Sequence, residues 1–359
     1  MRKQETVFLT GFPGFIAGRL LLRLAREGSR FLLLVQPAFA ERGKTEVLHL
    51  AEQTGRSVSD FQLLTGDITQ PGLGLSKEDL ETARSHTTDL FHLAAIYDLA
   101  VARDVAMRVN LEGTRNVNQF ARSMPRLRHY HYVSTCYVAG KRKGVIYEHE
   151  LQHDAGFRNY YEETKYLAEM EVDGLKPELP ITIHRPSVVC GDSHTGETAK
   201  YDGIYYLIHY LLKRPSLLSV FNIGNLDVSL NLVPVDFVVE AMSALARDPL
   251  SIGQTVQIAD PNPLTTRELF NTIARSIAGK EARVTLPASL VETSLMLPMA
   301  PRITDLPHSA VPYFFLEQTY DTAVATKLLA PHGISCPPFQ SYVKVIADYA
   351  ARHPVLDNL

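Results

Sequence analysis

The chain is predicted to form an α/β fold in which a doubly wound parallel sheet of about seven strands is joined to a smaller, mostly helical C-terminal domain. Short apolar runs alternate with helical segments at the spacing that is typical of such a sheet. A glycine-rich turn joins the first run to the first helix, and small or polar residues follow several later runs. The expected strands are 6–10, 30–35, 61–65, 89–93, 129–134, 181–184 and 254–259.

The composition is that of an ordinary globular protein, with 45% hydrophobic and 21% charged residues over 359 positions. The net charge of −3 gives no indication of a nucleic-acid partner. Cys136, Cys190 and Cys336 are widely spaced and form neither a metal-binding pattern nor a disulfide framework, so we expect a reducing, cytoplasmic location and no metal. We find no secretory signal and no apolar stretch long enough to span a membrane.

The glycine-rich turn directly follows the first expected strand. It reads Gly11-Phe12-Pro13-Gly14-Phe15-Ile16-Ala17, with Ala17 where a third glycine often stands. Helical periodicity follows over 18–27 and stops at Gly28. Glycines let the backbone approach a pyrophosphate, and the helix N-terminus offers free N–H groups and the positive end of its dipole. The context predicts a dinucleotide site; a plain strand–helix turn is the alternative.

The residue after the second expected strand bears on the choice between NAD and NADP. An acidic side chain there would bind the ribose 2′-OH of NAD and repel the 2′-phosphate of NADP. Gln36 occupies this position, and the basic Arg42 and Lys44 follow Glu41. We therefore expect NADPH to be preferred over NADH, unless Arg42 and Lys44 are ordinary surface charges.

Ligands of open parallel sheets bind beyond the carboxyl ends of the strands. Asp67 lies at such an end, where it could accept a hydrogen bond from adenine or cap a turn. His92 is expected to be a packed strand residue. The residues expected to contact the cofactor are Thr10, Gly11, Phe12, Pro13, Gly14, Phe15, Ile16, Gln36, Arg42, Asp67, Ile68, Ala94, Ala95, Ser134, Lys165, Pro186, Ser187 and Val188.

Tyr161 and Lys165 lie four positions apart in a segment rich in helix formers, so they share one face of a helix. A phenol has a reference pKa of about 10. A nearby ammonium group favours the phenolate and lowers this pKa. Such a pair can exchange a proton with an oxygen whose carbon exchanges a hydride. The motif alone is weak, but the glycine turn and the residues at the strand ends favour the catalytic interpretation.

These motifs together resemble the extended short-chain dehydrogenase/reductase family, in the family's order over about the first 190 residues. Within the family, the chain is most similar to the male-sterility type, which includes fatty acyl reductases and thioester reductase domains. The chain departs from this type at Gln36, because many members carry Arg at that position. No carrier or adenylation domain is attached, so a free-standing reductase is expected. The matching residues are Thr10-Gly11, Gly14, Ala17, Gly66-Asp67, Ala94-Ala95, Asn110, Ser134-Thr135, Tyr161, Lys165 and Arg185-Pro186-Ser187.

The resemblance implies roles for four catalytic residues. Tyr161 supplies a proton to the developing oxyanion, Lys165 lowers the Tyr161 pKa and binds the nicotinamide ribose, and Thr135 orients the carbonyl. Asn110 resembles a proton-relay residue, although a helix residue bonded to backbone would look the same. Cys136 is expected to be a packed thiol, because adjacent strand residues face opposite sides.

The expected dinucleotide-binding Rossmann domain comprises 1–191 plus about 231–261, and the substrate-binding domain comprises about 192–230 plus 262–359. Apolar and aromatic residues of the second domain suit a hydrophobic substrate, or they form its core. A homodimer through helices 104–124 and 160–172 is suggested by analogy only. The residues concerned with substrate are Tyr201, Tyr205, Tyr206, Tyr210, Phe221, Leu295, Met296, Leu297, Met299, Tyr313, Phe314 and Phe315.

The predicted function is NADPH-dependent reduction of a hydrophobic carbonyl compound. An acyl thioester, as acyl-CoA or on a carrier, is the foremost substrate, reduced to an aldehyde and in some cases onward to an alcohol. The first alternative is a ketone or aldehyde reductase, or an alcohol, sugar or steroid dehydrogenase, of the same family. The second is an inactive nucleotide-binding regulatory protein.

Overall fold

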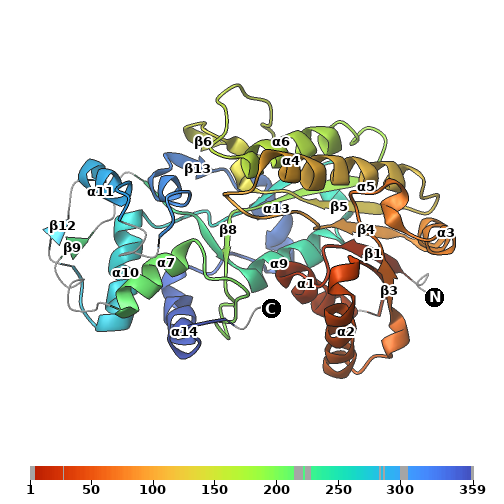
Figure 1. Ribbon diagram of the computed structural model, residues 1–359, viewed down its shortest axis with the longest axis horizontal. Helices are drawn as coiled ribbons and strands as arrows, with labels where there is room; N and C mark the ends of the chain where they lie inside the picture. The colour runs from red at the N-terminus through yellow and green to blue at the C-terminus, as the bar shows by residue number, and fades with distance from the viewer. Residues whose placement is uncertain are drawn as a thin grey trace.

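The computed structural model describes residues 5–26, 28–213, 221–222, 228–282, 284–285, 288–299 and 306–356. Figure 1 shows a sheet covered by helices on both faces at one end of the molecule and a mostly helical lobe at the other. The lobe is made largely from residues that follow the last-but-one strand of this sheet.

The large sheet has seven strands in the order β11-β7-β5-β4-β1-β2-β3, and all neighbours are parallel. All seven expected strands are confirmed, with ends that differ by one or two residues for the last four. The strands are β1 (Thr6–Thr10), β2 (Arg30–Val35), β3 (Phe61–Thr65), β4 (Asp89–His92), β5 (His129–Val133), β7 (Ile181–Pro186) and β11 (Thr255–Ile258).

Two apolar clusters, one on each face of the sheet, hold the helices in place. The first face packs against α1 (Phe15–Ala25), α2 (Ala40–Thr54), α9 (Val235–Leu245) and α13 (Ala323–Leu329). The second packs against α3 (Lys77–His86), α5 (Gly113–Arg122) and α6 (Tyr160–Asp173). Strands buried on both faces read as continuous apolar runs, which is why the sequence shows them clearly.

The helix expected over 104–124 is divided into three parts. It consists of α4 (Arg103–Ala106), a π-helical segment (Met107–Glu112) and α5. Gly113 permits a close approach at the end of this segment, because a Cβ there would lie 2.6 Å from a side-chain carbon of Ile68. Short π segments are often found at functional sites, and this one contains Asn110.

The helical lobe has its own apolar cluster, to which α7 (Ile204–Lys213), α10 (Thr266–Ala278) and α14 (Phe339–Arg352) contribute. The helix α10 begins with a capping box between Thr265 and Glu268. Outside the large sheet there are three small parallel pairs among the described residues, and α11 (Ala288–Leu295) is a further short helix. The pairs are β6 (Gly144–Ile146) with β13 (Gln318–Tyr320), β8 (Val188–Cys190) with β10 (Leu232–Pro234), and β9 (Phe221–Asn222) with β12 (Val284–Thr285).

One C-terminal segment packs on the sheet rather than on the lobe. β13 pairs with β6, and buried residues of α13 join the apolar cluster of α1 and α9. The segment 318–329 therefore lies with the sheet, although it falls within 262–359.

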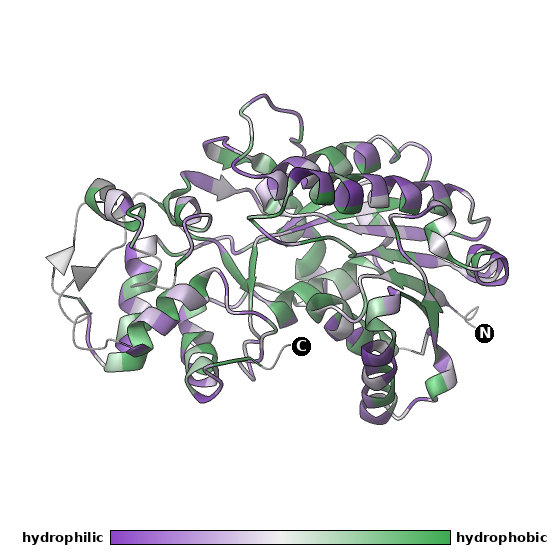
Figure 2. Cartoon of the chain, viewed as in Figure 1, coloured by the Kyte–Doolittle hydropathy of each residue, from purple (hydrophilic) through white to green (hydrophobic). Residues whose placement is uncertain are grey.

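The outward faces of α5 and α6 are hydrophilic (Figure 2). Exposed ion pairs join Arg115 to Glu171 at 2.6 Å and Arg122 to Glu178 at 2.9 Å. Among the described residues, no helix is both long and apolar enough to cross a membrane.

Candidate active site

The glycine turn brings the ends of β1 and β4 into contact. Gly11 has a φ of +93°, and a Cβ there would lie 2.8 Å from the backbone nitrogen of Ala94. Gly14 precedes α1 and is exposed; no side chain caps the helix, and no acidic residue lies in its first turn. The first N–H groups of α1 are thus open to an anion, and the turn fits the pyrophosphate of a dinucleotide.

The residues expected near the adenosine ribose have different surroundings. Gln36 is half-buried at the end of β2, and Arg42 is half-buried on α2. Lys44 forms an exposed ion pair with Glu41 at 2.7 Å, which matches the surface-charge alternative for this lysine. Asp67 accepts a hydrogen bond from the N–H of Thr69 at 2.8 Å, so it caps a turn.

Two serines expected near the cofactor use their hydroxyl groups inside the protein. Ser134 donates to the buried carboxylate of Glu169. Ser187 donates to Asn231 Oδ1 at 2.8 Å. Neither hydroxyl is directed to a cofactor in this structure, and the contacts expected of Ser134 and Ser187 would have to come from their backbone.

The structure brings Thr135 and Tyr161 together. Asn159 caps α6 by accepting from the N–H of Glu162 at 3.0 Å, and the helix begins at Tyr160. Thr135 caps the short helix Cys136–Ala139 by accepting from the N–H of Tyr137 at 3.2 Å, and its side chain lies close enough to Tyr161 to act on the pKa of the phenol. A carbonyl oxygen held between these two hydroxyl groups would meet two hydrogen-bonding partners.

The two titratable groups of the motif have displaced pKa values. Burial raises the pKa of Tyr161, and Thr135 opposes this rise. The phenol is therefore protonated at neutral pH and can act as a proton donor. Burial lowers the pKa of Lys165 to about 7, although Glu169 opposes the change. The expected lowering of the Tyr161 pKa by Lys165 is not found among the causes of its shift.

A row of three side chains runs beneath Lys165. Thr10, His92 and Tyr132 are neighbours in the register of β1, β4 and β5, so their side chains point to the same face. Lys165 Nζ lies 3.0 Å from Tyr132 Oη and 2.8 Å from the carbonyl oxygen of Val133. Lys165 is thereby fixed at the end of β5.

Thr114 of α5 joins this row into one buried polar network. Its hydroxyl donates to the carbonyl oxygen of Asn110 at 2.6 Å, lies 3.1 Å from His92 Nε2 and is close enough to Tyr132 to act on the pKa of its phenol. Thr10 Oγ1 lies 2.8 Å from His92 Nδ1 and accepts from the N–H of Ala94 at 3.1 Å.

The network determines the tautomer of His92. Thr114 gives its proton to Asn110, so it accepts from His92 Nε2–H, and His92 Nδ1 accepts from Thr10. His92 is therefore neutral, which agrees with a pKa lowered to about 3 by burial and by the charge of Lys165. The expectation of a packed strand histidine agrees with its complete burial. This network of fixed polar groups therefore extends from the glycine turn to Lys165.

Asn110 bonds backbone as the alternative interpretation expected, and its role in proton relay stays a prediction. Its Oδ1 accepts from the N–H of Ile96 at 2.8 Å, and its Nδ2 donates to Thr164 at 3.1 Å. It thus ties the chain after β4 to α6, and it contacts Lys165 only through Thr114 and Tyr132.

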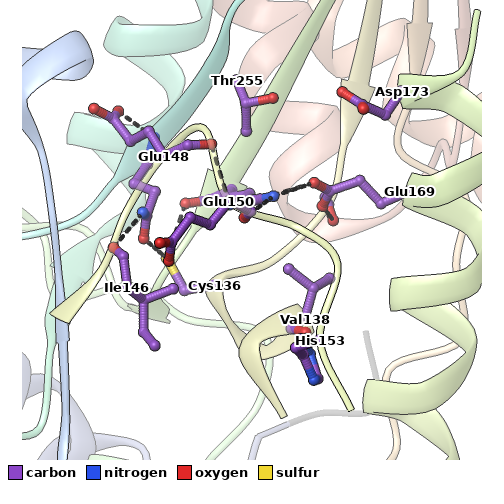
Figure 3. Close-up of polar contacts among 12 residues, drawn as sticks. Cys136, Val138, Ile146, Glu148, Glu150, His153, Glu169, Asp173 and Thr255 are labelled. Carbon is purple, nitrogen blue, oxygen red and sulfur yellow. Dashed lines mark hydrogen bonds and ion pairs between the residues drawn. The ribbon is translucent and has the colours of Figure 1, made fainter. Parts of the chain in front are cut away.

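A second buried network includes Glu169 and Cys136 (Figure 3). Arg185 donates to Glu169 Oε1 through Nε at 2.8 Å and through Nη2 at 2.6 Å. Cys136 donates to the carbonyl oxygen of Arg185 at 3.2 Å, and burial raises the pKa of its thiol. Cys136 is a packed thiol, as expected, although it lies in a short helix rather than on the strand that the sequence argument assumed.

An aromatic cavity of about 210 Å³ has Tyr97, a ring neighbour of Tyr161, in its wall, while Tyr161 itself does not line it. Tyr97 lines it and packs edge-on against Tyr161, with ring centroids 5.1 Å apart. Tyr313 donates to buried Glu162 at 2.6 Å, which connects the cavity wall to the start of α6. Its lining residues include Tyr97, Tyr137, Val188, Lys200, Asp202, Tyr206, Leu230, Tyr313 and Phe314.

The residues expected to serve the substrate divide into three groups. Tyr206, Tyr313 and Phe314 line the cavity. Others pack in the core or bond backbone elsewhere, and Met296, Leu297 and Met299 are exposed. The side chain of Phe221 lies outside the described residues. The packed or backbone-bonded members are Tyr201, Tyr205, Tyr210, Leu295 and Phe315.

The fold and these groups define a dinucleotide-binding protein of the extended short-chain dehydrogenase/reductase class. Residues 9–242 match the model of the NAD-binding family described as Male sterility protein, and the chain belongs to this family. In the described part of the chain, no group of three His, Cys, Asp or Glu residues could hold a metal ion.

Relatives and solved structures agree with this assignment. The fatty acyl-CoA reductase wat of Drosophila melanogaster is 27% identical over 286 residues, covering 68% of this chain and 54% of that protein. The chain thus spans about half the length of this relative. The terminal R domain of the myxalamid PKS-NRPS pathway superimposes with a TM-score of 0.82 at 25% identity, covering 100% of this chain and 93% of that domain. The reductase domain of a nonribosomal peptide synthetase from Mycobacterium tuberculosis has the same fold, with a TM-score of 0.71 at 18% identity over 98% of this chain and 92% of that chain.

Sequence reasoning missed Thr114, Tyr132 and Glu169, which support Lys165, and Tyr97 and Asp202, which line the cavity. Glu169 is four residues beyond Lys165 and therefore on the same helix face, so helical spacing could have found it. Tyr132 could have been found from the parallel register with His92. We see no local signal for Tyr97 or Asp202.

Proposed function

We propose that this protein uses NADPH to reduce an acyl thioester to an aldehyde. The observation that carries the proposal is the pairing of a protonated Tyr161 with Thr135 beside an aromatic cavity. The similarity to a fatty acyl-CoA reductase and to the myxalamid R domain supports the thioester as the substrate. An acyl group would occupy the cavity, with its carbonyl between the two hydroxyl groups.

The bound nicotinamide cofactor supplies the hydride. Thr135 and Tyr161 stabilise the negative charge that develops on the carbonyl oxygen, and Tyr161 gives it a proton. Lys165 is held by Tyr132 and Val133, and by the family resemblance it would bind the nicotinamide ribose. The resulting hemithioacetal breaks down to aldehyde and thiol, and a second reduction would give the alcohol.

The preference for NADPH rests on the end of β2. Gln36 places no negative charge there, and Arg42 remains available as a partner for a 2′-phosphate, since no ion pair of Arg42 is seen within the described residues. Lys44 is already paired with Glu41. Arg42→Ala should therefore raise the KM for NADPH and leave that for NADH nearly unchanged.

The deciding experiment follows cofactor absorbance with a long-chain acyl-CoA, the matching aldehyde and a hydrophobic ketone. Oxidation of NADPH with acyl-CoA, absent in Tyr161→Phe, is the expected result. Turnover of the aldehyde or ketone alone would replace the proposal by a carbonyl reductase or alcohol dehydrogenase. Cofactor binding without any turnover would indicate the regulatory alternative.

We also propose that residues 1–191 with 231–261 bind the cofactor and that 192–230 with 262–359 bind the substrate. The aromatic cavity supports this division, because its walls combine residues of both parts. A homodimer through α5 and α6 would have to bury the exposed ion pairs of Arg115 and Arg122, so light scattering at several salt concentrations would test it.

A further inference from the structure

The aromatic cavity contains a carboxylate for which the proposed reduction has no use. Asp202 lies in its wall with a side chain only 20% exposed. Burial raises the pKa of Asp202, and Lys200 opposes this rise. Lys200 Nζ lies 3.5 Å from Asp202 Oδ2, and its own side chain is 59% exposed.

A negative charge here opposes the chemistry at Tyr161. The reaction places negative charge on the substrate oxygen, and Asp202 is close enough to raise the pKa of Tyr161. Like charges at such a site disfavour the transition state. A carboxylate in this position therefore requires a compensating positive charge during the reaction.

The surroundings of Asp202 are those of a site for an organic cation. Aromatic faces attract ammonium groups within about 6 Å of the ring centroid, and a carboxylate adds a charge partner. The ammonium of Lys200 already lies 5.1 Å from the ring centroid of Tyr97. The other aromatic residues of the cavity are Tyr137, Tyr206, Tyr313 and Phe314.

Lys200 is poorly suited to be the permanent partner of Asp202. Its side chain is long and mostly exposed, and ion pairs of exposed lysines are weak because solvent screens them. A ligand cation that is held more rigidly can therefore displace it. The cavity volume of about 210 Å³ suits a short acyl group better than a long alkyl chain, because pockets for drug-sized ligands occupy about 300–1,000 Å³.

We propose that the acyl group of the substrate carries an ammonium group, which replaces Lys200 beside Asp202 and the ring of Tyr97. Asp202 is then a specificity-determining residue, and the substrate itself neutralises its charge. The inference rests on the proposed thioester reduction, and it narrows the acyl group to a short, cationic one.

The test compares two thioesters of N-acetylcysteamine with the same shape and different charge. One carries a γ-trimethylammoniobutanoyl group, and in the other a carbon atom replaces the nitrogen. NADPH oxidation gives kcat/KM for each, and calorimetry with the two corresponding amides gives affinities that do not depend on turnover. We expect the cationic member of each pair to be favoured about tenfold or more.

Variants separate Asp202 from general effects on the cavity. Asp202→Asn should abolish the preference for the cation. Asp98→Asn is the matched control, because Asp98 lies on the same cavity, bonds the N–H of Ala100 at 2.8 Å, and should keep the preference. Lys200→Met should strengthen binding of the cationic amide, since it removes the internal competitor; this exposed substitution serves if Asp202→Asn fails to fold.

The outcomes distinguish the two proposals. Equal or better use of the neutral thioester, with equal binding of the two amides, would overturn the cation site and leave the reductase intact. Selective binding of the cationic amide without reduction of either thioester would support the site and refute the reductase. Loss of amide binding in Lys200→Met, or an unchanged preference in Asp202→Asn, would also overturn the cation site.

Discussion

Tyr161 lies between two regions that are built in different ways. On one side, Lys165 is fixed by a buried hydrogen-bond network whose members come from neighbouring strand ends and from α5. On the other side, the aromatic cavity combines the chain segments around residues 97–100, 200–206 and 307–314 with Tyr137, Val188 and Leu230. The first region fixes the positions of charges, and the second provides shape and the half-buried carboxylate of Asp202.

This difference shows how the molecule separates chemistry from substrate choice. Polar groups in the network satisfy one another, so each has little freedom to move. The cavity walls meet mainly through ring contacts, such as that of Tyr137 with Tyr313 at 4.6 Å. Substitutions in the network should therefore change mainly kcat, and substitutions in the cavity should change mainly KM.

The largest effect is expected at the residue that both regions share. Tyr161→Phe removes the proton donor and one partner of the oxyanion while keeping the ring contact with Tyr97. Loss of one such donor typically costs about 10²–10³ in kcat. Steady-state kinetics and a thermal melt would check this, and a variant with more than a tenth of wild-type kcat would exclude the assigned role.

The pH dependence should report the charge of Lys165. Its pKa is lowered to about 7, so the ammonium loses its proton above this pH, and kcat/KM should fall by about tenfold per pH unit. Tyr161 stays protonated in this range. The pKa of Lys165 in the folded protein lies below its unfolded value of about 10.4. Between about pH 7 and 10 the unfolded state therefore binds more protons than the folded state, and the contribution of Lys165 to the free energy of unfolding rises with pH. A rate that is constant to about pH 9 would contradict the prediction.

Tyr132→Phe would test the network itself. It removes the 3.0 Å contact with Lys165 and the contact with Thr114. We expect kcat to fall by about tenfold with little change in KM, since a fixed catalytic group would become mobile. Tyr130→Phe is the control, because Tyr130 lies on the same strand face, is buried and bonds Asn118 at 2.9 Å. Equal kinetic effects of both variants would mean that only stability had changed.

Tyr313→Phe would test the wall of the cavity. It breaks the 2.6 Å bonds to Glu162 and Asn159 but keeps the ring beside Tyr137. The KM for the substrate should rise several-fold and kcat should change little, while the loss of a donor to buried Glu162 should cost about 1–3 kcal/mol of stability. Tyr320→Phe, which affects only a bond to Gln318, provides the comparison. A large fall in kcat would show that the two regions are not separate.

The smallest effect on activity is expected when one of the three buried histidines of β5 and β7 is substituted. Burial lowers the pKa of His129 to about 4 and that of His184 to about 3, and His131 is also strongly lowered. In the unfolded state each histidine binds a proton below about pH 6.5, whereas in the folded state it does not. The free energy of unfolding should therefore fall between about pH 6.5 and pH 4, and each histidine should contribute about 1.4 kcal/mol per pH unit to this fall. Urea unfolding of His131→Phe should show a shallower pH slope; an unchanged slope would exclude this cause.

Several expectations were met because their signals are local. The seven apolar runs became the seven strands of one sheet, and the helix carrying Tyr161 and Lys165 begins at Tyr160. The helix over 104–124 was predicted as continuous but contains a π segment where Gly113 packs against Ile68. That contact joins residues far apart in sequence, so no local pattern could show it.

The sequence by itself determined the parallel sheet, the glycine turn and the placement of Tyr161 and Lys165 on one helix, because strand length, turn chemistry and helical spacing depend on neighbouring residues. Only the tertiary structure decided that Tyr132 and Thr114 hold Lys165, that Ser134 turns to Glu169, and that Asp202 lies among aromatic rings. These contacts depend on strand register and on the packing of segments that are distant in sequence. Register and packing decide which hydrogen bonds form and which groups are buried, and these in turn set the charge of each group.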